Sequence, residues 1–161
     1  NDAFMFTQGS TSKAQNKILF HDYNKAYDQF KQLENIATFR SQIDAYKDLV
    51  KNCPPGKEQA HDLDFMLIYG ELFTLVAYGQ LILEAAKIEN LDVDLVDQIF
   101  DFMVRDFSKY AVQLYSKTSS TAEQMAACMK MVKKPKANAE RYERVTKEYV
   151  YALNGQYAMN P

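Results

Sequence analysis

Residues able to do chemistry are few and scattered in this sequence. Among its 161 residues are only two cysteines and two histidines, at Cys53, Cys128, His21 and His61. Glu58 and His61 have the Glu-x-x-His spacing of di-iron helical bundles, but such sites need two of these motifs and two further glutamates. No glutamate lies three residues before His21. We therefore expect no metal, and a solvent-exposed helix start at residues 58–61.

Nucleophilic and phosphate-binding motifs are also missing. Cys128 lies in a helical stripe rich in methionine and alanine rather than in a strained turn beside a histidine base. The sequence has no Gly-x-Ser-x-Gly element and no glycine-rich dinucleotide or phosphate loop. We expect Cys53 and Cys128 to be buried thiols rather than a disulfide, as in a reducing compartment, and we expect a cytoplasmic protein.

Glu71 is the best candidate for a special role. It interrupts an apolar run between Phe65 and Leu83, where desolvation favours the neutral form of a carboxyl group unless a cation or donor meets it. The more ordinary interpretation is a structural polar contact with Arg40, Arg105 or a tyrosine.

The elements that must position these residues follow from apolar spacing. Steps of three and four predict one amphipathic helix over residues 18–51, which the prolines of residues 52–56 end. A second helix covers residues 57–88. Further helices follow, with starts that we assign to Asp92, to a capping box at Ser120–Glu123, and to Asn138; the last ends at Asn154-Gly155. We expect an all-α, four- to five-helix bundle, mostly antiparallel because the connections are short.

The second of these helices differs in kind from the others. A helix that is apolar on nearly every side is buried, so residues 65–83 should form the centre of the bundle. Gly70 and Gly79 each cost about 1 kcal/mol of helix stability, which close helix contacts would offset. The run reaches the length of a membrane span, but Glu71 and Gln80 would each need a partner in lipid, so we expect no membrane span.

The net charge and the N-terminal residues bear on which partners the chain could bind. A net charge of −2 offers no field for nucleic acid. Residues 1–12 combine the apolar Phe4-Met5-Phe6 with a polar run, and we interpret them as a tether or strap before a single bundle domain at residues 13–161. We expect the chain to be part of a longer protein. Because exposed apolar clusters are usually covered, we expect the strap, residues 9–27 and an exposed helix face to mediate self-association or docking; alternatively, the strap covers its own bundle.

Opposite charges gather on two helices. We interpret them as solvated faces, or as surfaces that steer a homodimer or seat the chain against a larger domain. The acidic set is Asp94, Asp97 and Asp101, and the basic set is Lys130, Lys133, Lys134, Lys136, Arg141, Arg144 and Lys147.

Two stretches resemble a known family. Residues 70–84 (GELFTLVAYGQLILE) and 97–111 (DQIFDFMVRDFSKYA) resemble the C-terminal helical region of acyl-CoA dehydrogenase-like flavoproteins. In some bacterial members an extra helical domain follows the catalytic core, and there a helix rich in small residues precedes one ending in a similar aromatic and alanine run. The resemblance covers about residues 20–160.

The resemblance implies a parent enzyme that uses FAD and takes a fatty acyl-CoA, from which it removes a proton and a hydride with a glutamate base. This chain lacks a β-rich segment, and Tyr69-Gly70-Glu71 is not the element that carries that base. We therefore carry over no catalytic or FAD-binding residue and expect an inactive accessory domain. It would dock on the catalytic core of its parent or form an oligomer with a second copy. The alternative is a free-standing helical bundle that binds an apolar ligand or partner.

Overall fold

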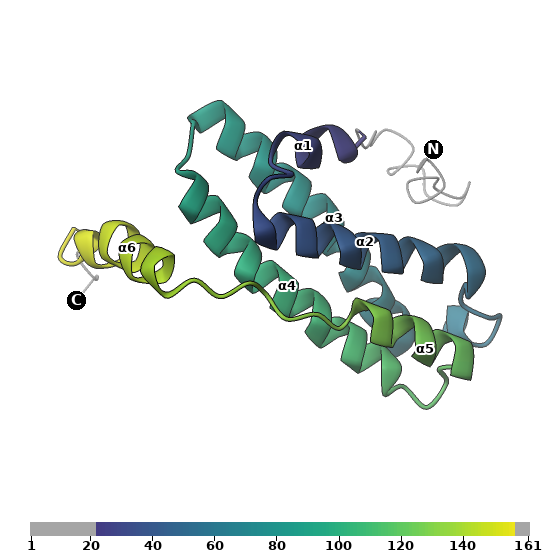
Figure 1. Ribbon diagram of the computed structural model, residues 1–161. Helices are drawn as coiled ribbons and strands as arrows, with labels where there is room; N and C mark the ends of the chain where they lie inside the picture. The colour runs from purple at the N-terminus through teal and green to yellow at the C-terminus, as the bar shows by residue number, and fades with distance from the viewer. Residues whose placement is uncertain (1–21, 157–161) are drawn as a thin grey trace.

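The computed structural model describes residues 22–156, and every regular element within that range is helical (Figure 1). This confirms the predicted all-α bundle. The helices are α1 (Asn24–Gln29), α2 (Glu34–Asn52), η3 (Gln59–His61), α3 (Leu63–Glu89), α4 (Val93–Tyr115), α5 (Ala122–Met131), α6 (Ala139–Tyr149) and η4 (Tyr151–Leu153). The predictions for the strap, Phe4-Met5-Phe6 and His21 fall outside the described residues.

The core forms where α2, α3, α4 and α5 meet, and α6 lies apart at the other end of α4 (Figure 1). An extended segment, residues 132–138, runs back along the bundle from α5 to α6. Aromatic side chains from α2 and α4 fill the centre: the Phe39 ring makes edge contacts with Phe100 and Phe107, each with ring centroids 5.4 Å apart. These contacts tie α2 to α4 beyond what buried area alone contributes.

The predicted helix over residues 18–51 is wrong as one element, because α1 and α2 are separate. The chain turns at Phe30–Leu33, and Leu33 has extended backbone angles before α2 begins. The break lets α1 pack on α3, where the Tyr27 hydroxyl donates to the Val76 carbonyl oxygen at 3.1 Å. Because apolar residues continue at steps of three and four through the turn, their spacing does not reveal it. The split gives six α-helices among the described residues instead of four or five.

The expected burial of residues 65–83 holds for one side of α3 only. One side packs into the core through Phe65, Leu72, Val76 and Leu83. The opposite side is solvent-exposed, because the helices that pack on α3 (α1, η3 and α4) all contact its inner side.

The predicted helix starts are mostly right. Asp92 and Asn138 cap α4 and α6 by accepting hydrogen bonds from the backbone N–H groups of Asp94 and Arg141. The capping box of α5 lies one residue later than predicted, with Thr121 as the cap and Gln124 as its partner. The last helix ends earlier than predicted, at Tyr149, although Gly155 does have a left-handed backbone (φ 79°).

Candidate interaction surface and a separate groove

The exposed side of α3 carries a long, mainly apolar stripe, which we call the α3 face. Its large side chains are strongly exposed: Leu63 by 73%, Tyr78 by 55% and Ile88 by 83%, with Leu67 and Leu81 between them. Smaller residues complete it at Gly70, Thr74, Ala77 and Ala85. Exposed apolar stripes of this length in soluble proteins mark interaction surfaces.

Judged by length and composition alone, α3 is long and apolar enough to cross a membrane, with a mean hydropathy of 1.5 over an 18-residue window. A third of that window is buried inside the bundle. One such helix is weak evidence for a span, since core helices of soluble proteins pass the same test.

Glu71 lies half-buried at the edge of the α3 face. Both arginines proposed as its partners are engaged elsewhere: Arg40 with Asp28 at 2.8 Å and Arg105 with Asp101 at 2.7 Å. Within residues 22–156 no side chain pairs with Glu71, so its expected structural contact is not found there.

The two helical glycines differ in their surroundings. A Cβ at Gly79 would overlap the Tyr27 hydroxyl and lie 3.4 Å from Cζ of Phe100, so the absence of a side chain lets α1 approach α3. This confirms the predicted helix contact at Gly79. A Cβ at Gly70 would meet nothing within 4 Å, so the contact predicted there is not found in the described part of the chain.

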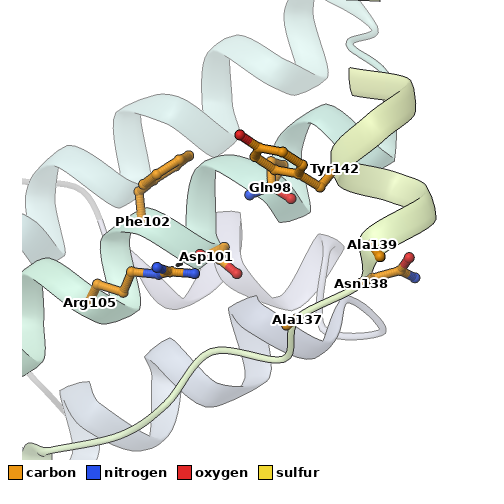
Figure 2. A pocket seen from close by; sticks show the side chains of 8 residues that line it. All are labelled: Gln98, Asp101, Phe102, Arg105, Ala137, Asn138, Ala139 and Tyr142. Atoms are coloured by element: carbon orange, nitrogen blue, oxygen red, sulfur yellow. Dashed lines mark hydrogen bonds and ion pairs between the residues drawn. The ribbon is translucent and has the colours of Figure 1, made fainter. Parts of the chain in front are cut away.

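A groove lies between α4 and the start of α6 (Figure 2). Its volume is about 430 Å³. The Phe102 and Tyr142 rings form its walls, and the Arg105–Asp101 ion pair lies at one end. Both rings are more than half exposed, which makes the groove shallow and open.

Below this groove, a buried polar network joins four segments. Asp97, only 4% exposed, binds the guanidinium of Arg141 and accepts from the backbone N–H of Asn35 at 2.9 Å. That N–H belongs to the first turn of α2, whose preceding residue Leu33 provides no side-chain cap. The Asn35 side chain also accepts from the backbone N–H of Lys136 at 2.7 Å. Asp97 therefore caps α2 from α4 and anchors both the extended segment and α6.

Asp94 and Asp97 thus hold α6 on α4, while Asp101 is buried and pairs with Arg105 of its own helix. The interpretation of Asp97 and Asp101 as solvated residues is therefore wrong. Arg144 of α6 pairs with Asp92, at 2.7 Å, and with Asp94. The hydrogen bond from Arg144 is the main reason why the pKa of Asp92 lies below its usual range. Opposite charges on α4 and α6 therefore satisfy each other, while Lys133, Lys134, Lys136 and Lys147 are exposed.

Buried glutamines form polar contacts that sequence reasoning missed. The Gln42 amide donates to the carbonyl oxygens of Val104 at 3.1 Å and of Met131 at 2.8 Å, which joins α2 to α4 and α5. The signal was present, because Gln42 is a polar residue on the apolar stripe between Phe39 and Tyr46.

The described residues bring together no catalytic or metal-binding set. Cys128 is buried, and burial is the main cause that raises its pKa to about 11, so the thiol stays protonated at neutral pH. Cys53 is a half-buried free thiol, and His61 is exposed. Within residues 22–156, no three His, Cys, Asp or Glu side chains lie close enough to hold a metal ion.

Comparison with known proteins gives one partial similarity. Residues 111–145 match a family model described as a phage tail fibre repeat. The match spans the end of α4, all of α5, the extended segment and the first half of α6. No curated protein and no solved structure matches the chain.

Proposed function

We propose that this chain is a helical docking domain of a larger acyl-CoA dehydrogenase-like oxidoreductase and that it attaches through the α3 face. The observation that carries the docking role is the exposed apolar stripe from Leu63 to Ile88 on an otherwise packed bundle. The resemblance of residues 70–84 and 97–111 to the helical region of those flavoproteins supports the choice of parent. Both stretches lie on the paired helices α3 and α4.

In this proposal FAD and the fatty acyl-CoA belong to the catalytic core of the parent. The chain itself contributes contact area to that core or to a second copy of the enzyme. The tail fibre repeat match covers too short a part of the chain to transfer the role of a fibre to it.

The docking role is tested on the purified chain with a dye that fluoresces on apolar surfaces. We expect strong dye binding that falls several-fold in Leu67→Ser/Leu81→Ser, while circular dichroism is unchanged because both side chains are exposed. Val112→Ser on α4, also half exposed, is the matched control and should leave dye binding unchanged. Equal dye binding by all three proteins would contradict the docking role.

The assignment to a flavoprotein parent has its own test. We expect the purified chain to be colourless, without flavin absorbance, and unable to oxidise an acyl-CoA. The reading frame that encodes it should also encode a flavoprotein core ahead of Asn1. A yellow chain that retains flavin through purification, or a frame without such a core, would contradict this assignment.

A further inference from the structure

We propose that the partner of the α3 face is an amphipathic α-helix with an apolar stripe bordered by lysine or arginine. This inference rests on the proposed docking role of the α3 face and names the chemistry of its occupant.

The spacing of the face indicates a helical partner. From Leu63 to Ile88 its central residues occur at steps of three and four, at positions 63, 67, 70, 74, 78, 81, 85 and 88. This is the period of about 3.5 residues with which two helices pack side by side. The face is about 38 Å long at 1.5 Å per residue, enough for more than three heptads of a second helix.

Small residues allow that helix to come close. Gly70, Thr74, Ala77 and Ala85 lie between the large side chains, and the distance between packed helices depends on the side chains at their contact. Gly70 lowers helix stability by about 1 kcal/mol relative to alanine, and nothing described in this chain uses the space that it leaves. An approaching partner backbone would use that space.

The charges beside the face determine the charge of the partner. With about 3.6 residues per turn, Asp64, Glu71 and Glu89 lie along one edge of the stripe and Glu84 lies along the other. Of these four acids, only Asp64 forms an ion pair within the described residues, with Lys117. Glu84 accepts a hydrogen bond from Gln80 at 2.8 Å, which leaves its charge uncompensated. Basic side chains on both edges of a partner helix would complement these acids.

The same charges argue against a second copy and against an anionic membrane. In a two-fold dimer through this face, both edges of one α3 would meet acidic edges of the other, whether the helices run parallel or antiparallel. Like charges placed opposite each other lower affinity. Anionic lipid headgroups would be repelled in the same way.

The experiment uses the full chain and two synthetic helical probes of three heptads. Both probes carry leucine and isoleucine at the packing positions; one has lysine at the flanking positions and its twin has glutamate. Fluorescence anisotropy at low salt should show the lysine probe binding roughly tenfold more tightly than its twin, as expected from a few exposed ion pairs. Tyr78→Asp should abolish binding of the lysine probe, whereas Val112→Asp should not.

Charge-reversal variants distinguish ion pairing at the edges of the α3 face from attraction between the probe and the net charge of the chain. Glu71→Lys/Glu84→Lys should reverse the preference, so that the glutamate probe binds more tightly. Glu140→Lys/Glu143→Lys changes the net charge equally at exposed sites on α6 and should leave the original preference intact. A preference that reverses equally in both double variants would overturn the proposal.

Other outcomes assign the face to another occupant. Equal binding of both probes, lost in Tyr78→Asp, would overturn the basic helix but keep the docking role. A dimer in sedimentation that Tyr78→Asp dissociates would identify a second copy and overturn the proposal. Probe binding that appears only after deletion of residues 1–21 would assign the face to that segment, and Tyr78-dependent binding to phosphatidylcholine vesicles would assign it to lipid. Binding of neither probe, with dye binding unchanged by Leu67→Ser/Leu81→Ser, would overturn the docking role as well.

Discussion

Two glycines on one helix show how surroundings decide the effect of a missing side chain. Alanine is the better helix former by about 1 kcal/mol at both positions, since glycine loses more backbone freedom on folding. At Gly70 a Cβ meets open space, whereas at Gly79 it meets the Tyr27 side chain, which is fully buried and cannot swing aside.

We therefore expect substitutions of opposite sign. Gly70→Ala should raise the free energy of unfolding by about 0.5–1 kcal/mol. Gly79→Ala should lower it by about 1–3 kcal/mol, because an added methyl group displaces neighbours in a close-packed core. Urea unfolding of the two variants and of the unsubstituted chain measures both changes. Stabilisation by both substitutions would show that α1 does not pack at Gly79.

Arg141 and Arg40 both form ion pairs with aspartates but differ in burial. Arg141 and Asp97 are each about 95% buried, whereas Asp28 is mostly exposed beside Arg40. Removing one member of a buried pair leaves the other charged and desolvated.

We expect Arg141→Ala to lower the free energy of unfolding by about 3 kcal/mol or more, and Arg40→Ala by less than about 1 kcal/mol. Urea unfolding measures both. Protease cleavage in residues 132–138 should also accelerate in Arg141→Ala alone, because that segment loses the hydrogen bond that the Arg141 guanidinium donates to the Lys136 carbonyl oxygen at 3.0 Å. Equal losses in the two variants would contradict the network at Asp97.

At the scale of elements, sequence reasoning located helices better than it located their breaks and surroundings. The caps Asp92 and Asn138 act on backbone groups two or three residues away, so local spacing was enough to find them. The turn at Phe30–Leu33 accompanies the long-range contact of Tyr27 with α3, which no local pattern encodes.

The α3 face and the polar network at Asp97 also depend on long-range contacts that local sequence patterns do not reveal. A hydrophobic pattern on all sides of α3 is compatible with burial in a core and with burial by a partner, and it cannot distinguish the two. Glu71 was singled out because of the residues beside it in sequence, although its suggested partners bind other groups. Asp97 looked like a surface acid because its partners, Asn35 and Arg141, lie far away in the sequence.

The start of α5 provides a test at this scale. The Thr121 hydroxyl accepts from the backbone N–H of Gln124 at 3.3 Å, and the Gln124 side chain accepts from the backbone N–H of Thr121 at 3.0 Å. Thr121→Ala should lower the free energy of unfolding by about 1 kcal/mol, the usual cost of a lost helix cap. Thr118→Ala, exposed in the preceding loop, is the control and should change little. A larger loss from Thr118→Ala in thermal or urea unfolding would contradict this cap.

At the scale of the whole molecule, buried tyrosine hydroxyls tie the helices together. Tyr27 of α1 donates to Val76 of α3, and Tyr46 of α2 donates to the Tyr69 carbonyl oxygen of α3 at 3.2 Å. Burial is the main cause that raises the pKa of Tyr27 and of Tyr46 well above the usual range, and it raises the pKa of Tyr69 to about 12. Each hydroxyl therefore keeps its proton in the folded state at a pH where it would lose it in the unfolded chain.

This difference makes the bundle sensitive to alkaline pH. Because the pKa values are higher in the folded state, the tyrosines contribute full stability below their unfolded pKa of about 10, and that contribution falls as pH rises above it. The pKa of Cys128, raised to about 11, adds a decline that begins near pH 9 and is smaller in total because its pKa is raised less. We expect the free energy of unfolding in urea to fall between about pH 9 and 11.5, by up to about 1.4 kcal/mol per pH unit for each retained proton.

Tyr46→Phe should be less stable than the unsubstituted chain at pH 7, but its stability should decline less steeply with pH. Exposed Tyr151→Phe should have the stability of the unsubstituted chain at every pH. If the free energy of unfolding of the unsubstituted chain stayed constant up to pH 11, these hydroxyls would not join the helices in solution.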